Sequence, residues 1–179
     1  MANSTVNLAK SSKLVSPVVT ELLSFGSTSL SASTWTTVTD GTTNLSVTIT
    51  PSATTSKVLL TCTLNYHCAG TSGGSLLFFK IQRNGSDIKV GDAASSRVQA
   101  GFCSLGRTGS TLTGPGHNLT FMVLDNPAST SSQTYTVQVY PGGVTPNTIT
   151  FYVNEGNTNT DASTNAVAYS QIAATEVLA

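Results

Sequence analysis

Residues 57–66 read KVLLTCTLNY, with an apolar side chain at every second position: Val58, Leu60, Cys62, Leu64 and Tyr66. Since successive side chains of a β-strand point to opposite faces, this alternation predicts a strand buried on one face only. Residues 75–83, SLLFFKIQR, then run into Asn84-Gly85, which is the strongest short signal for a β-hairpin. These two segments predict an all-β fold.

The same period of two recurs on both sides of this stretch. Residues 34–39 end at Asp40-Gly41, a second hairpin signal, and residues 44–50 (NLSVTIT) end at Pro51. The other candidate strands are residues 86–90, 95–104, 117–124, 133–140, 148–154 and 168–177. Many short strands at this spacing favour a sandwich or a barrel, with almost no helix beyond residue 30. The expected core contains Val47, Ile49, Cys62, Leu64, Phe79, Phe121, Val123, Val137 and Phe151.

The composition excludes several classes of partner. Charged residues make up 9% of the chain and the net charge is zero, so no strongly basic face is available for nucleic acid. No apolar run approaches the length of a membrane span, and the N-terminus lacks the apolar core of a secretory signal. Three cysteines, an odd number, argue against a disulfide framework. We therefore expect synthesis in a cytoplasm, with reduced thiols, and no membrane or nucleic-acid partner.

Residues 1–30 differ from the rest and are predicted to be an N-terminal arm, followed by a head at residues 31–179. Six apolar residues interrupt the polar arm: Leu14, Val15, Val18, Val19, Leu22 and Leu23. Their spacing fits one face of a helix that Pro17 begins, and it also fits an extended arm in a partner's groove. We expect them to bind a partner.

Residue types that carry catalysis are few and scattered. The chain has eight carboxylates and two histidines, and several of the acids stand beside turn residues, as Asp40 does before Gly41. Cys62, His67 and Cys68 lie close enough to suggest zinc ligands, but their spacing fits no standard site. Alternation instead assigns Cys62 to the core. We expect no catalytic residue, no metal and no cofactor, with all three cysteines as free thiols.

One loop has a polar composition that can serve binding. Residues 154–165, NEGNTNTDASTN, contain Asn154, Asn157, Asn159 and Asp161. Their oxygens suit calcium and their amides suit a sugar, while a solvated polar loop explains them more simply. We keep these four as a possible distal loop site.

Several features occur together in an order that resembles a domain of phage structural and tail-fibre proteins, especially from marine and cyanobacterial hosts. They are Trp35 with Asp40-Gly41, residues 45–51, Phe79 with Arg83-Asn84-Gly85, Gly91-Asp92-Ala93 with Arg97, and Ile172 with Glu176-Val177. The resemblance implies a jelly-roll-like β-sandwich of about eight to ten antiparallel strands, a homotrimer and no catalytic residues. Leu76, Leu77 and Phe78 also favour a partner subunit, since three consecutive apolar residues in a strand imply that both faces are covered.

The chain departs from fibre members of that family because about thirty residues precede the head. Fully extended, they reach at most ~100 Å, too little for a shaft. The leading hypothesis is therefore a capsid decoration or cement protein of a phage virion, bound to major capsid subunits on the head. The alternative is a short tail fibre or tail tip, held by tail proteins, that contacts host surface glycan. A remote alternative is a β-sandwich hydrolase or lyase.

Overall fold

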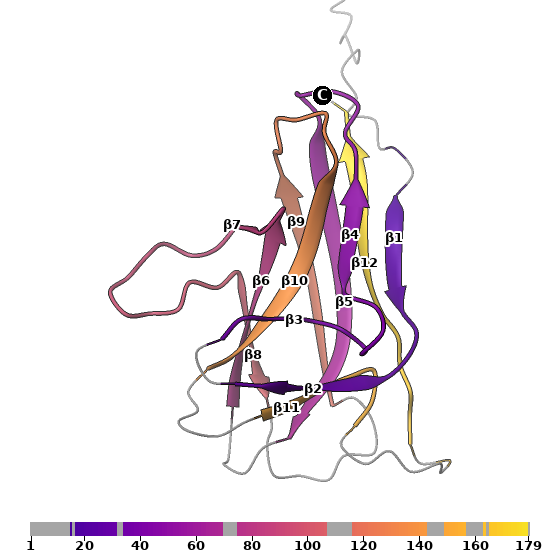
Figure 1. Cartoon of the computed structure of the whole chain (residues 1–179), viewed down its shortest axis with the longest axis vertical. Helices are drawn as coiled ribbons and strands as arrows, with labels where there is room; N and C mark the ends of the chain where they lie inside the picture. Colours follow the sequence, from indigo (N-terminus) through magenta and orange to yellow (C-terminus); the bar gives the residue numbers. More distant parts are fainter. Residues whose placement is uncertain are drawn as a thin grey trace, which may run out of the picture.

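Two antiparallel sheets pack as a β-sandwich in the computed structural model of the chain (Figure 1). The structure describes these residues: 15, 17–31, 34–69, 75–106, 116–142, 149–156, 163 and 165–178. Within them it contains twelve strands and no helix, and the strands span more than a third of the chain. The prediction of an all-β sandwich is confirmed.

Sheet A is built around one long strand, β5 (Lys57–Ala69). Its strand order is β1 (Val18–Leu22), β12 (Ser170–Val177), β5, β11 (Ile149–Val153) and β2 (Gly26–Leu30). The strand β9 (His117–Asp125) pairs with β5 along residues 58–66. On its other edge β5 pairs first with β12 and then, from Tyr66 onward, with β11.

Sheet B is built around β10 (Gln133–Gly142) and β6 (Ser75–Arg83), which pair over eight residues of each strand. Two short strands, β3 (Thr36–Thr37) and β4 (Ser46–Ile49), flank β10. On the other side of β6 lie β7 (Ser86–Ile88) and β8 (Phe102–Gly106). A long connection between β7 and β8 extends away from the body of the sandwich (Figure 1).

The core fills the space between the two sheets. All nine side chains predicted for it are buried. Tyr66 is fully buried in it, with its ring centroid 5.6 Å from that of Phe79 and 5.3 Å from that of Phe151. Its hydroxyl donates a 2.6 Å hydrogen bond to Ser104 Oγ in the opposite sheet, so even the polar atom of this residue is satisfied.

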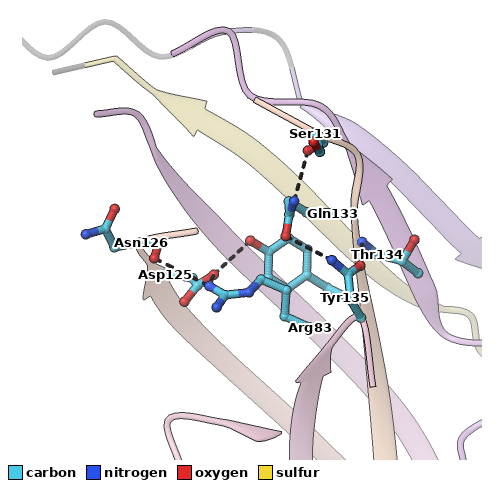
Figure 2. A network of polar contacts seen from close by, with 8 residues as sticks. Arg83, Asp125, Asn126, Ser131, Gln133, Thr134 and Tyr135 are labelled. Carbon is cyan, nitrogen blue, oxygen red and sulfur yellow. Dashed lines mark hydrogen bonds and ion pairs between the residues drawn. The ribbon is translucent and has the colours of Figure 1, made fainter. Parts of the chain in front are cut away.

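One end of the sandwich is closed by a polar network that spans the two sheets (Figure 2). The buried Tyr135 hydroxyl donates to Asp125 Oδ2, and Arg83 Nη1 contacts the same oxygen at 2.7 Å. Beside them Asn84, at positive φ in the hairpin turn, donates through Nδ2 to Gln133 Oε1 at 3.0 Å. The network fixes the ends of β6, β9 and β10 relative to one another.

All ten predicted strands occur, but their limits shift where turn geometry intervenes. The segment predicted at residues 95–104 becomes strand only at Phe102, because Ser95 has positive φ and Gly91 N donates to Ala100 O across a loop. Two strands within residues 1–30, β1 and β2, were missed. Residues 18–30 therefore belong to the sandwich, where the sequence suggested a separate arm.

The helical interpretation of residues 15–22 is wrong. Val18 to Leu22 pair with Ala174 to Ser170 in an antiparallel ladder, and Val15 N donates to Glu176 O at 3.0 Å. β-Branched valines fit such a ladder at little cost in side-chain freedom. Leu22 is fully buried, so it is a core residue and contacts no partner in the folded domain.

Candidate interaction surfaces

Three carboxylates of the described residues have clear structural partners. Asp40 Oδ1 accepts hydrogen bonds from the backbone N–H groups of Thr42 and Thr43, at 2.9 and 2.7 Å. Asp87 forms a 2.8 Å ion pair with Lys80. Glu176 Oε1 accepts from both the backbone N–H and the hydroxyl of Ser52, each at 2.7 Å. Asp40 closes a turn, as turn chemistry suggested, whereas Asp87 and Glu176 link separate segments of the chain.

The cysteine and histidine cluster separates across β5. Cys62 and Cys68 are buried, and burial raises the pKa of Cys62 to about 12 and that of Cys68 to about 11. Both thiols are therefore protonated, and poor nucleophiles, at neutral pH. Strand alternation directs His67 to the other face, where its ring lies 5.9 Å from that of Tyr152. Within the described part of the chain, no three His, Cys, Asp or Glu side chains form a group that could hold a metal.

Asn154 is a structural residue and not part of an exposed loop. It is fully buried at φ 64°, and its Nδ2 donates to the carbonyls of Leu22 and Ser24, each at 2.7 Å. Its Oδ1 accepts from Ser170 Oγ at 2.6 Å. With its amide used in this way, Asn154 holds the corner between β1 and β2 and cannot contact a ligand. Asn157, Asn159 and Asp161, predicted with it, lie outside the described residues, as does Leu14 of the arm.

A first candidate surface is the β1 edge, which we define as residues 15 and 17–25. Five apolar side chains there are between 40% and 66% exposed: Val15, Val18, Val19, Leu23 and Phe25. Four of them are residues that the sequence assigned to partner binding. Among the described strands β1 pairs only with β12, so it stands at an edge of sheet A. The β1 edge thus combines exposed apolar area with the backbone of an edge strand.

A second candidate surface is an aromatic cluster on the outer face of sheet B. The ring of Tyr140 lies 5.2 Å from that of Trp35 and 6.1 Å from that of Phe78. Lys80 Nζ lies 4.3 Å from the Trp35 ring centroid, a cation–π contact. Leu76, 42% exposed, continues the apolar area along β6. Leu77 is buried in the core, while Leu76 and Phe78 face outward.

A third candidate surface is a grid of side chains on the outer face of sheet A, where β12, β5 and β9 lie side by side. Pairing places Gln171, Thr63 and Thr120 in one row, and Ala173, Thr61 and Met122 in the next. A third row contains Asn65 and Asn118, with Tyr169 just before β12. We call these nine residues the outer grid. A groove of about 400 Å³ lies over part of it, lined by Thr61, Cys62, Thr63, Thr120, Phe121, Met122 and Gln171.

The sequence singled out Leu76, Leu77 and Phe78, but it indicated neither the cluster of Phe78 with Tyr140 and Trp35 nor the outer grid. The available signal was the polar half of each alternation, for example Thr61, Thr63 and Asn65 between the core positions of residues 57–66. These polar residues can be recognised as one surface only when the pairing of the strands is known, and the paired strands lie far apart in the sequence.

Comparison of the sequence with protein-family models and with curated proteins found no match. In the described residues, no helix has the length and apolarity that crossing a membrane requires.

Proposed function

We propose that this chain is a non-catalytic structural protein of a phage particle, and specifically a decoration protein on the capsid surface. The single observation that carries the proposal is the β1 edge, where five exposed apolar side chains accompany an edge strand. The resemblance of the sequence to phage structural proteins supplies the kind of particle. The partner is the major capsid protein.

Two physical effects at the β1 edge suit docking. Burying a large apolar side chain contributes about 1.5–3 kcal/mol before the entropy of ordering is subtracted. An edge strand can also accept a partner strand through its backbone, which adds hydrogen bonds and sets the orientation. A homotrimer, assembled through the aromatic cluster of sheet B, would present three such edges and gain avidity.

The docking test must leave the core intact. Deleting residues 1–25 would remove β1 and the buried Leu22, so substitution is the sharper test. The double variant Val19→Thr with Leu23→Ser removes exposed apolar area from the edge. Val98→Thr is the matched control, since Val98 is exposed in the connection between β7 and β8. Sedimentation with purified phage heads should show weaker binding of the double variant and wild-type binding of the control.

Location and copy number on the particle test the role itself. Gold-labelled antibody on purified particles should decorate heads, and quantitative mass spectrometry should find many copies per particle. Label confined to tails, at a few copies, would replace decoration by the tail-tip role. Absence of the chain from purified particles would overturn a virion function altogether.

A further inference from the structure

We propose that the outer grid of sheet A binds a neutral oligosaccharide, which lies in the groove lined by Gln171, Thr63 and Met122 and extends to Tyr169. The inference does not rest on the capsid role, because the grid residues are not those of the β1 edge, although Ala173 and Gln171 of the grid pair with Val19 and Glu21 of β1. The grid offers a site for glycan contact in place of the distal loop that contains Asn154.

The grid offers a sugar ring an apolar surface. The side chain of Tyr169 is 52% exposed and lies on the same face as Gln171, two residues further along. Aromatic rings with an exposed face pack against the C–H face of a pyranose, and the phenolic hydroxyl remains in water. Met122, 68% exposed, provides a flexible apolar surface at the opposite corner of the grid.

Between these two residues the grid presents oriented hydrogen-bonding groups. Thr120 Oγ1 donates to Asn118 Oδ1 at 2.9 Å, Asn118 Nδ2 donates to Asn65 Oδ1 at 3.0 Å, and Asn65 Nδ2 donates to Tyr169 O at 2.6 Å. This chain of bonds fixes the rotamers before a ligand arrives, which lowers the entropic cost of binding. A hydroxyl that donates its only proton keeps its lone pairs as acceptors, and each amide has a second N–H. The hydroxyl groups of a sugar donate and accept hydrogen bonds, so they need acceptors and donors on the protein.

The charge of the surface selects among sugars. None of the nine grid residues is charged, and the neighbour of Gln171 on β1 is the exposed carboxylate of Glu21. Sialylated, sulfated and phosphorylated glycans would find no cation within the grid and an anion beside it. The groove, at about 400 Å³, falls within the size range of small-molecule sites. The surface therefore fits a short neutral stretch of hexose or N-acetylhexosamine units.

The test uses the full chain on a glycan array that carries neutral hexose and N-acetylhexosamine oligosaccharides beside sialylated and sulfated ones. Tyr169→Ala should bind the best neutral glycan about tenfold more weakly, because the stacking surface is lost. Thr63→Val removes one hydroxyl at nearly constant shape and should weaken binding severalfold. Thr48→Val is its matched control, an exposed threonine on the outer face of sheet B. Far-ultraviolet circular dichroism and melting curves establish that each variant is folded.

Amide chemical shifts measured by NMR during titration with the best neutral glycan should change along β5, β9 and β12. Three results would overturn the proposal: no neutral glycan bound at millimolar concentration, preference for anionic glycans, or equal binding by Tyr169→Ala, Thr63→Val and the wild type. If the grid variants lose binding to phage heads and no glycan binds, the face docks protein and the proposal also fails.

Discussion

The phenolic hydroxyl of Tyr135 donates a 2.8 Å hydrogen bond to Oδ2 of Asp125, and so joins sheet B to sheet A inside the sandwich (Figure 2). Since Asp125 is buried, loss of this donor leaves the carboxylate with fewer partners in a poorly solvated place.

We expect Tyr135→Phe to lower the free energy of unfolding by about 1–3 kcal/mol, the cost of a buried hydrogen bond to a charged group. Urea unfolding measures it. The control is Tyr140→Phe, whose ring lies in the aromatic cluster on the outer face of sheet B. An equal loss of unfolding free energy in both variants would mean that the hydrogen bond between the sheets does not contribute more to stability than the hydroxyl of Tyr140.

Asn154 should be the most sensitive polar residue of the corner between β1 and β2. Asn154→Gly keeps the positive φ accessible and removes the amide that bridges Leu22, Ser24 and Ser170. We expect a loss of about 2–3 kcal/mol, since buried backbone carbonyls are left unsatisfied. Asn84→Gly is the matched control at an exposed turn with positive φ and should cost less. Unfolding in urea, with intrinsic fluorescence as the probe, distinguishes the two.

The pH dependence of stability should reflect the protonation of the two histidines. Burial lowers the pKa of His67, which His117 lowers further, and burial also lowers the pKa of His117. A lowered folded-state pKa means that stability is full above the unfolded value of about 6.5 and declines as the pH falls through the folded value. Melting curves at about pH 8 and about pH 5.5 should show this decline, reduced in His67→Phe.

Glu155 should change stability with pH in the direction opposite to His67, so it serves as a control. Burial raises the pKa of its carboxyl, so its contribution to stability grows as the pH falls. Glu155→Gln should therefore steepen the acid-side decline, while His67→Phe flattens it. A wild-type protein equally stable at both pH values, with His67→Phe unchanged, would contradict the assignment to His67.

The proposed homotrimer should depend on the outer face of sheet B. Leu76→Thr removes exposed apolar area beside the aromatic cluster and should shift the chain towards the monomer. Light scattering after size-exclusion chromatography measures the mass at micromolar concentration. Leu124→Thr, a similarly exposed leucine on sheet A, should leave the trimer intact. A wild-type monomer would remove the basis for avidity.

The thiols should differ sharply in reactivity. Cys103 is exposed, whereas Cys62 and Cys68 are buried with raised pKa values, so a thiol reagent should label Cys103 alone in the native protein. All three should react in denaturant. Cys103→Ser should therefore abolish rapid labelling of the native protein. Rapid labelling of this variant would show that a buried thiol becomes accessible.

Much of the sandwich could be predicted because its central strands alternate cleanly. Residues 75–83 were predicted with the limits of β6, since apolar positions and the Asn-Gly turn agree there. Strands β1 and β2 lacked that signal: Val18 and Val19 remain exposed, and the partner of β1 is β12, far away in sequence. Leu22 consequently looked like a docking residue.

The candidate surfaces were harder to predict for a related reason. Tyr169, Thr63 and Asn118 lie in one grid only because β12, β5 and β9 pair in a particular register. Polar residues on a solvated face constrain that register weakly, so a single sequence does not reveal which of them are neighbours. Asn154 illustrates the converse, because a residue type typical of loops is buried by a corner that the sequence did not indicate.

The pairing of β1 with β12 has a consequence for biosynthesis. The first described strand is held by the last, and β5 also waits for β9, β11 and β12. Until residues 170–177 have left the ribosome, β1 and part of one edge of β5 have no partner strand, so the sandwich closes only after β12 has been synthesised. The nascent chain carries its unpaired apolar strands until then, and that interval is when chaperones would protect it from aggregation.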